Sequence, residues 1–360
     1  MAADPRRFPG FLTVHSLLIV GTLGLACATV ASRSGDPPAR SVPRGRAAAS
    51  TTEPRPTLGP LAAPPSPPVS LDARLAGMGF ALPEHANVYA VRVVEGAQGR
   101  VYQQFQAGGG ALAEDFWPAS SIKVLAALGA LDFARSLGYT GAATVTFDGD
   151  EDDGTRTLRS IYEPAIRDSS NYDYDLLVRI AGRDRLNSQF LTAAHGFPAT
   201  SITRSYAQTE LDDSPAMILE EGDKRTYVPE RKAVLDPECK AGNCSNLFEM
   251  AESVRRIVLA EQLPPEQRFD LDPTDLADLR QSLLEAEGFF APAVAAVLGR
   301  GARLYSKPGD AADLDCLDVA FIEAADGRKF LLAATVPHAA GGCDTLVELA
   351  TDVLKLLTVT

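Results

Sequence analysis

The hydrophobic pattern begins with a short helix and a strand pair. Residues 71–78 are amphipathic with a helical period, and residues 87–94 and 100–105 are strand-like runs on either side of a turn at 96–99. Polar and apolar residues alternate in the first of these runs, as they do in a strand whose successive side chains point to opposite faces. The pattern therefore predicts a β-hairpin.

The middle of the chain is predicted to be mostly helical. Residues 121–137 are rich in alanine and leucine, which predicts a buried helix, and residues 158–180 contain two helical patterns joined at 168–171. Residues 204–240 are irregular and are expected to form a long functional loop. Further helical patterns occur at 190–196, 247–259 and 276–284.

The chain closes with three predicted strands, at 302–306, 318–323 and 329–336, and a helix at 345–357. The N-terminal and C-terminal strands must share one sheet to bury their apolar faces. We therefore predict an α+β fold, in which an antiparallel sheet of N- and C-terminal strands packs against a helical lobe. The cleft between sheet and lobe is the expected place for a site.

The N-terminus resembles a targeting segment. Arg6 and Arg7 precede residues 8–31, which carry no charged side chain. This pattern is typical of a secretory signal peptide. Residues 23–27, Leu-Gly-Leu-Ala-Cys, also resemble a bacterial lipobox with Cys27 as the lipidated residue, and an uncleaved membrane anchor is the third alternative. We expect export to the periplasmic or extracellular face, with lipid or membrane anchoring left open.

Residues 33–70 are dense in proline, alanine, serine, threonine and arginine, and they lack aromatic residues. Such a segment buries too little surface to offset its ordering entropy, and its prolines favour an extended tether. The predicted organisation is a signal peptide or anchor at 1–32, a disordered Pro/Ala-rich linker at 33–70, and one folded domain at 71–360.

Charge and cysteine content narrow the partners. A net charge of -13 argues against nucleic acid, which requires a basic face, but small anionic substrates respond to the local field of a cleft. No cofactor and no metal is expected, and the lack of a C-x-x-C spacing argues against a zinc site in particular. We expect a monomer. An even cysteine count in an exported chain predicts disulfides, and of the three possible pairings we favour Cys239–Cys244 and Cys316–Cys343.

A serine and a lysine lie three residues apart where a predicted helix begins. Ser120 and Lys123 share one helical face at this spacing, so their side chains can meet. A serine hydroxyl needs a nearby base to act as a nucleophile at neutral pH, and a partly desolvated lysine can be that base. Alone, the pair fits a helix-capping serine beside a surface lysine better than a catalytic site.

Two further motifs follow in chain order. Ser169 and Asn171 form S-x-N at a helix junction, and Lys307 and Gly309 form K-x-G after a predicted strand. The ordered set S-x-x-K, S-x-N and K-x-G resembles the serine β-lactamases and penicillin-binding proteins, with the class A branch most similar. The resemblance covers most of residues 71–360.

The resemblance implies a role for each motif residue. Ser120 would be the acylated nucleophile, Lys123 would polarise or deprotonate it, and Ser169 would relay a proton to the leaving nitrogen. Asn171 would hold the amide side chain of the substrate and contact Lys123. Lys307 would supply positive charge near Ser169 and the substrate carboxylate.

The resemblance implies that the K-x-G motif binds substrate. This motif also departs from the family pattern. Gly309 and Asp310 would line the substrate, and the backbone N–H groups of Ser120 and Asp310 would form the oxyanion hole. Pro308 stands where the family has threonine or serine, so a hydroxyl and an N–H group are lost. The loss of the N–H group is tolerable on an edge strand. Because the hydroxyl would hydrogen-bond a substrate carboxylate, we expect its loss to weaken carboxylate binding.

The second departure concerns deacylation. Class A enzymes carry a Glu-x-x-Leu-Asn segment after S-x-N, and aligning it on Leu211 places Gln208 at the general-base position. A neutral amide cannot take a proton from water. Glu210, Glu220 or Glu221 would substitute only if the loop is rearranged.

Three functions follow from this resemblance. The first is an exported class A-like β-lactamase that opens β-lactam rings through a Ser120 acyl-enzyme, and we favour it narrowly because the Ser–Lys–Ser–Lys set is intact. The second is a slowly deacylating enzyme similar to a D,D-peptidase, with a D-Ala-D-Ala peptide as substrate. The third is a non-hydrolytic sensor lipoprotein that holds penicillin or peptidoglycan.

Overall fold

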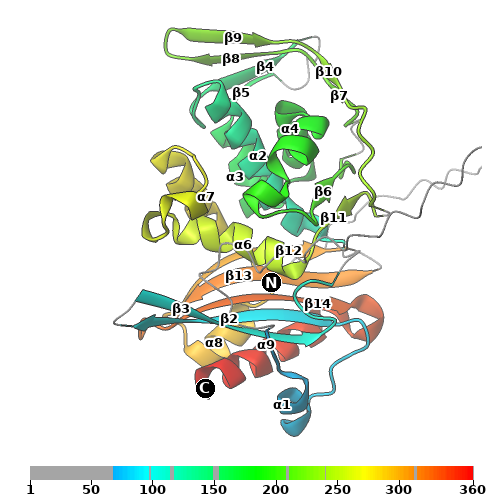
Figure 1. The fold of residues 1–360 in the computed structure, drawn as a ribbon, viewed down its shortest axis with the longest axis vertical. Coiled ribbons are helices and arrows are strands. Elements are labelled where there is room, and N and C mark those ends of the chain that lie inside the picture. Colours follow the sequence, from blue (N-terminus) through cyan, green and yellow to red (C-terminus); the bar gives the residue numbers. More distant parts are fainter. Residues whose placement is uncertain are drawn as a thin grey trace, which may run out of the picture. The chain divides into compact units, whose positions relative to one another are not determined.

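The described part of the structure, a computed structural model, is residues 68–359 apart from 97–98, 114–116, 149–153, 208–210, 240 and 312–313. Within it, six strands form one sheet in the order β1-β3-β2-β14-β13-β12, and helices cover both faces (Figure 1). The predicted leader at 1–32, with Cys27, and most of the predicted linker lie outside the described residues.

The large sheet consists of β1 (Val69–Ser70), β2 (Asn87–Gly96), β3 (Gly99–Gly108), β12 (Arg303–Asp310), β13 (Asp315–Glu323) and β14 (Lys329–Pro337). The helices are α1 (Asp72–Gly77), α2 (Lys123–Ser136), α3 (Arg159–Arg167), α4 (Asn171–Ala181), α5 (Arg183–Arg185), α6 (Leu247–Val258), α7 (Pro273–Glu285), α8 (Ala291–Leu298) and α9 (Gly342–Val359). Short 3₁₀ turns are η1 (Ala119–Ile122), η3 (Ala193–His195), η4 (Ala260–Gln262), η5 (Pro265–Gln267) and η6 (His338–Ala340), and η2 (Leu186–Phe190) is a π-helical turn.

The predicted union of N- and C-terminal strands is confirmed. β2 pairs antiparallel with β14 in the register Tyr89↔Ala333, and β14 continues into β13 and β12. β1 pairs with β3, so Val69 and Ser70, which the sequence pattern assigned to the linker, belong to the sheet. The predicted α+β class is thereby confirmed.

Strand alternation divides the core into two layers. Tyr89 and Val91 face a cluster that includes α2, α4 and α6, whereas Val88 and Ala90 face a cluster that includes α8 and α9. Successive side chains of a strand point to opposite faces, so one strand can serve both cores. Lys307 shares the parity of Tyr305, which belongs to the cluster on the α2 side, so β12 presents this lysine toward the helical lobe.

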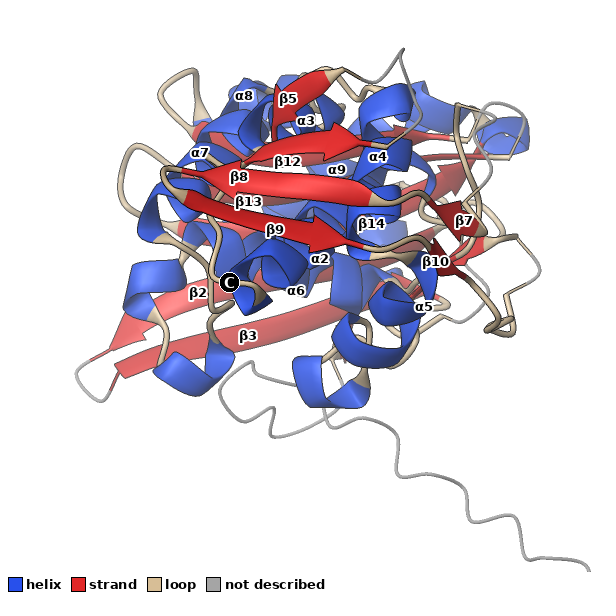
Figure 2. Ribbon diagram, turned by 90° about the horizontal axis from the view of Figure 1, so that it is seen from above, coloured by secondary structure: helices blue, strands red, loops and turns tan. Residues whose placement is uncertain are grey.

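The expectation of a long irregular loop at 204–240 is wrong. Strands β8 (Met217–Glu221) and β9 (Lys224–Val228) form a hairpin around Gly222, whose φ of 59° requires the left-handed region. The hairpin joins β4 (Thr144–Phe147) and β5 (Thr155–Thr157) in a second sheet over the helices (Figure 2). Two short pairs complete the region: β7 (Asp213–Ser214) with β10 (Arg231–Lys232), and β6 (Ser201–Ile202) with β11 (Asn243–Cys244).

Other differences from the predicted elements are local. The helix predicted at 190–196 is replaced by η2, Leu191 and Thr192, and the 3₁₀ turn η3. The predicted strand at 302–306 continues to Asp310 and contains the whole K-x-G motif. Within the described residues, no helix combines the length and apolar character needed to cross a bilayer.

Proline is accommodated inside β12 because this strand is the edge of the sheet. Ala311 N–H donates to Asp315 O at 2.8 Å, so Ala311 is a hydrogen-bonded position of the antiparallel ladder. Bonded and non-bonded positions alternate along such a ladder. Pro308 and Asp310 therefore present their backbone nitrogens to the open edge, and the missing N–H of Pro308 costs the sheet no hydrogen bond.

Candidate active site

Ser120 lies in the 3₁₀ turn η1, which leads directly into α2 at Lys123. The N–H of Lys123 donates to Ser120 O, so the two residues lie one turn apart, although the α-helix begins later than predicted. Ser120 is half-buried, and among the described residues no hydrogen bond engages its Oγ atom. Its N–H belongs to a first turn, whose N–H groups have no acceptor within the helix.

Lys123 is fully buried and directed at the S-x-N motif. Its Nζ donates to Asn171 Oδ1 at 2.7 Å, to Ser169 Oγ at 3.2 Å, and to the backbone oxygen of Ser169. Three acceptors match the three N–H bonds of an ammonium group. Loss of one proton from Lys123 would leave a lone pair on Nζ, which is the form a base requires.

Ser169 Oγ also accepts from a second lysine, which lies on the edge strand of the large sheet. Lys307, fully buried on β12, donates from Nζ to Ser169 Oγ at 2.8 Å. A hydroxyl oxygen accepts two hydrogen bonds and still donates its own proton. With both lysines bound to its oxygen, Ser169 therefore keeps its proton available for a third group.

The junction between α3 and α4 presents the S-x-N motif. Ser170 Oγ caps α4 by accepting from Asp173 N–H at 3.2 Å, and Asn171 is the first residue of that helix. Ser169 has φ of 57°, a left-handed conformation that is unfavourable for a residue with a side chain. Backbone strain of this kind is found where surrounding contacts impose it, and here the contacts of both lysines converge on this residue.

Burial lowers the pKa values of both lysines, and like charge lowers that of Lys123 further. The pKa of Lys123 falls to about 7, first because of desolvation and then because of the charge of Lys307, while Asp173 and Asp175 act in the opposite direction. Desolvation lowers the pKa of Lys307 to about 8, against the attraction of Asp318. Each lysine can therefore change protonation near neutral pH.

Gly309 allows η1, the turn that contains Ser120, to approach the edge strand. A Cβ atom at Gly309 would lie 3.0 Å from Pro118 O, closer than an ordinary contact. Pro118 O accepts from Ser121 N–H at 3.0 Å, so this carbonyl is part of the turn that holds Ser120. The structure thus places the edge nitrogen of Asp310 on the strand that packs against this turn.

Two residues near this site, Tyr206 and Asp175, were not singled out from the sequence. Tyr206 accepts from Trp117 Nε1–H at 3.2 Å and donates to Ala119 O at 2.8 Å. The buried carboxylate of Asp175 accepts from Tyr206 N–H at 2.9 Å and from Ala207 N–H at 3.0 Å. In the sequence, Asp175 directly precedes the apolar residues Leu176 and Leu177, which is a signal of burial. Its hydrogen-bond partners lie about thirty residues further along the chain.

Of the positions considered for deacylation, Glu220 and Glu221 are described, and both lie away from the site. Gln208 and Glu210 lie outside the described residues. Glu221 accepts from the N–H and hydroxyl of Thr140, beyond the far end of α2, and Glu220 pairs with Arg225 on the hairpin. Since α2 spans about 20 Å from Lys123, the suggestion that Glu220 or Glu221 supplies a base is wrong.

Both favoured disulfides are present. Cys239–Cys244 closes a loop at β11, and Cys316–Cys343 links β13 to α9. A trio of potential metal ligands, Asp310, His338 and Cys343, lies at the end of β12. The sulfur of Cys343 is already bonded to Cys316, and Asp310 pairs with His338 at 2.8 Å, so this trio does not provide a metal-binding set.

Comparison with known proteins identifies the fold. No protein-family model and no curated protein matches the sequence. A class A β-lactamase from Mycobacterium abscessus matches the structure with a TM-score of 0.55 at 17% identity, covering 80% of this chain and 99% of that one. A variant of PBP-A, solved as an acyl-enzyme complex with penicillin G, matches with a TM-score of 0.55 at 17% identity, covering 82% and 100%.

A third solved structure agrees. The chromosome-encoded β-lactamase of Vibrio parahaemolyticus matches with a TM-score of 0.54 at 14% identity, covering 79% of this chain and 98% of that one. Likeness at such low identity establishes the fold. The chain therefore has the fold of class A β-lactamases and penicillin-binding proteins, as the three motifs predicted.

Proposed function

We propose that this chain is an exported serine hydrolase that opens β-lactam rings through an acyl-enzyme on Ser120. The observation that carries the proposal is the meeting of two buried lysines at one serine hydroxyl: Lys123 and Lys307 lie 3.2 and 2.8 Å from Ser169 Oγ. This arrangement supplies a base, a proton relay and a cation in one place beside the nucleophile. Acyl transfer from a lactam nitrogen requires these three groups.

Acylation starts from neutral Lys123. Ser120 Oγ attacks the carbonyl carbon of the lactam, and the hydroxyl proton passes to Lys123 Nζ. The carbonyl oxygen becomes an oxyanion, which the N–H groups of Ser120 and Asp310 stabilise. The loss of one such donor typically reduces the rate by about 10² to 10³, so both N–H groups are central to this step.

Collapse of the tetrahedral intermediate breaks the carbon–nitrogen bond of the ring. Ser169 Oγ gives its proton to the leaving nitrogen, and Lys123 returns to Ser169 the proton that it took from Ser120. Lys307 stays cationic and holds the Ser169 oxygen throughout. The products are a Ser120 ester and an opened ring, with no net gain or loss of protons, and water then hydrolyses the ester.

A slowly deacylating, penicillin-binding enzyme is the second candidate. Among the described residues, Lys123 Nζ donates to oxygens of Ser169 and Asn171, and no carboxylate accepts from it. Gln208, at the aligned base position, cannot remove a proton from water. Both observations favour an acyl-enzyme that persists, on a β-lactam or on a D-Ala-D-Ala peptide.

Two disulfides support the proposed location outside the cytoplasm, since such bonds persist in oxidising compartments. We include in the proposal an attachment to the membrane surface through the N-terminal segment. Lipid labelling of the full chain and of a Cys27→Ser variant tests this part. Label retained on Cys27→Ser would contradict lipidation at that residue.

The test of the catalytic proposal is turnover of a chromogenic cephalosporin, followed together with intact mass. Sustained turnover supports the β-lactamase. A single burst with a persistent adduct supports the slow enzyme, and in that case Gln208→Glu is expected to accelerate release. If neither turnover nor an adduct is found, both enzyme hypotheses are rejected and the non-hydrolytic binding protein remains. Ser120→Ala is the matched control, and an adduct on that variant would show that the site is assigned to the wrong serine.

A further inference from the structure

The peptide bond in front of the nucleophile is held by a tyrosine. Tyr206 donates its hydroxyl proton to Ala119 O at 2.8 Å, and its oxygen accepts from Trp117 Nε1–H at 3.2 Å. Ala119 C=O and Ser120 N–H belong to the same amide group. A hydrogen bond to this carbonyl therefore acts directly on the N–H group that we assign to the oxyanion hole.

Two effects follow for that amide. A hydrogen bond to the carbonyl polarises the amide and strengthens its N–H as a donor, as in other chains of hydrogen bonds. The bond also fixes the orientation of the amide plane. This plane needs support because Ala119 has φ of 42°, in the left-handed region that non-glycine residues disfavour.

Tyr206 is itself held firmly. Its backbone N–H donates to the buried carboxylate of Asp175 at 2.9 Å, and its ring stacks on Tyr174 with centroids 4.7 Å apart. The Lys123 Nζ atom lies 5.6 Å from the Tyr206 ring centroid on the α2 side. Burial raises the pKa of Tyr206 to about 12, so its hydroxyl keeps its proton over the working pH range.

We propose that Tyr206 is a positioning residue of the oxyanion hole, acting through the Ala119–Ser120 peptide in a relay that begins at the Trp117 indole. The inference rests on the proposed acylation of Ser120. In this proposal the segment that follows β6 contributes to catalysis. Asp175 holds the segment in place, and Tyr206 within it determines how strongly Ser120 N–H donates.

The test is Tyr206→Phe, which removes the hydroxyl and keeps the ring on Tyr174. We expect the acylation rate constant for penicillin G to fall about tenfold, less than the loss of a whole oxyanion donor, with little change in the dissociation constant of the non-covalent complex. Rapid-mixing difference infrared spectroscopy of the acyl-enzyme, with a ¹³C-labelled ester carbonyl, is expected to show this band at higher wavenumber in the variant, because its oxyanion-hole hydrogen bond is weaker.

Tyr174→Phe is the matched control. It removes a hydroxyl from the other ring of the same stacked pair, where the partners are Arg204 O and Asn243 Nδ2. Its carbonyl band is expected to match the wild type even if its melting temperature falls. A second variant, Trp117→Phe, removes the donor to Tyr206 and is expected to give a smaller shift in the same direction.

The outcomes separate this inference from the proposed function. If the wild type forms no Ser120 adduct, the proposed function fails and the role of Tyr206 falls with it. If the wild type is acylated but Tyr206→Phe keeps the same rate constant and carbonyl band, the positioning role is wrong while the proposed function stands. A slower rate with an unshifted band would also overturn it, because that result indicates a general structural effect.

Discussion

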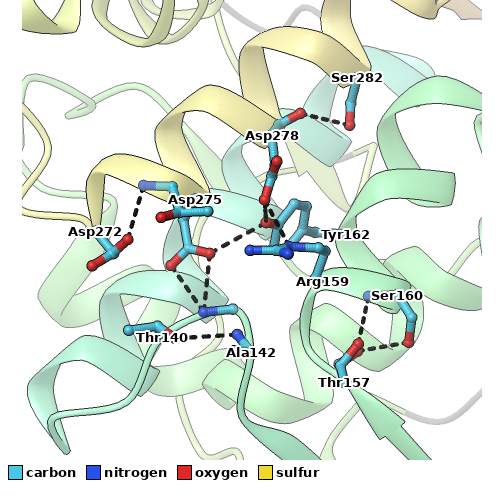
Figure 3. A network of polar contacts seen from close by, with 12 residues as sticks. Thr140, Ala142, Thr157, Arg159, Ser160, Tyr162, Asp272, Asp275, Asp278 and Ser282 are labelled. Carbon is cyan, nitrogen blue, oxygen red and sulfur yellow. Dashed lines mark hydrogen bonds and ion pairs between the residues drawn. The ribbon is translucent and has the colours of Figure 1, made fainter.

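Two buried polar networks of this molecule differ in how their charges are balanced. In the first, Lys123 and Lys307 converge on Ser169, so two cations face each other across one hydroxyl. The second lies between α3 and α7 (Figure 3), where Asp275 accepts from Gly141 N–H at 3.0 and 2.9 Å and from the Tyr162 hydroxyl at 3.3 Å. Arg159 pairs there with Asp278 at 2.6 Å, so opposite charges are neighbours.

The network around Asp275 stabilises the fold, whereas the charges around Ser169 suit the acyl transfer that we propose. Around Asp275, desolvation raises the pKa of the carboxyl, and the hydrogen bonds from Gly141 and Tyr162 and the charge of Arg159 oppose this shift. Around Ser169, burial lowers the pKa of Lys307 to about 8, and burial together with the charge of Lys307 lowers the pKa of Lys123 to about 7. Perturbation of this kind is characteristic of functional sites.

The largest expected effect is that of Lys123→Met. The acylation rate constant is expected to fall about 10² to 10⁴-fold, the typical contribution of a general base, when measured by stopped-flow mixing with a chromogenic cephalosporin. The same variant is expected to be more stable at pH 7 by roughly 1 to 3 kcal/mol in urea unfolding, because an apolar side chain replaces a desolvated cation. A variant that loses both activity and stability would contradict the contrast between the networks.

The stability of the protein is expected to depend on pH through Lys123. Its pKa is about 7 when folded and 10.5 ordinarily, so the unfolded chain binds more protons between these values. The stability of the wild type should therefore rise with pH across this window, and the penalty should be fully present below it. The advantage of Lys123→Met is expected to shrink as pH rises toward 10, which urea unfolding at several pH values measures.

Next in size is Asp275→Ala, which tests the other network. It leaves the buried N–H of Gly141 and the Tyr162 hydroxyl without their acceptor, which is expected to cost about 3 kcal/mol of unfolding free energy. The acylation rate constant of the folded fraction should be unchanged. A lowered rate constant with intact stability would mean that this network also serves the site.

The sequence motifs identified residues that the structure brings together, whereas the sequence pattern missed strands in the lobe around them. Ser120, Lys123, Ser169, Asn171 and Lys307 were found because each lies in a short motif whose order along the chain is informative. Tyr206 and Asp175 were not found because their contacts join residues far apart in sequence. No local pattern distinguishes such a pair from ordinary surface or core residues.

The missed strands have a physical explanation too. β8 and β9 are only five residues long, and both ends next to the turn are charged: Glu220 and Glu221 end β8, and Lys224 and Arg225 begin β9. The two-residue turn Gly222-Asp223 is typical of a β-hairpin, but the whole segment was interpreted as a functional loop. β12 was ended too early because proline usually stops a strand, and the edge position that tolerates Pro308 follows only from the sheet order.

A further prediction concerns the electrostatic coupling between Lys123 and Lys307. Acylation needs neutral Lys123 and cationic Lys307, so its rate is expected to rise through about pH 7 and fall through about pH 8. Lys307→Met removes the charge that lowers the pKa of Lys123. The acid limb of the rate profile should then move to higher pH and the alkaline limb should disappear; an acid limb that stays in place would show that the lysines are not coupled.

The smallest expected effect is that of Pro308→Ser on β12. A hydroxyl at this edge position adds one hydrogen bond to a substrate carboxylate, worth about 1 to 2 kcal/mol. The dissociation constant for a carboxylate-bearing β-lactam is expected to fall roughly five- to thirtyfold. The methyl ester of the same compound is the control, and an equal gain for the ester would show that the hydroxyl does not read the carboxylate.

The most direct test of the account is the rate at which penicillin G modifies Ser120, measured by peptide mass across pH 5 to 10. The account predicts a single covalent adduct on the peptide that contains Ser120, formed at a rate that rises through about pH 7 as Lys123 becomes neutral. An adduct elsewhere, no adduct at any pH, or a rate without a transition near pH 7 would contradict it.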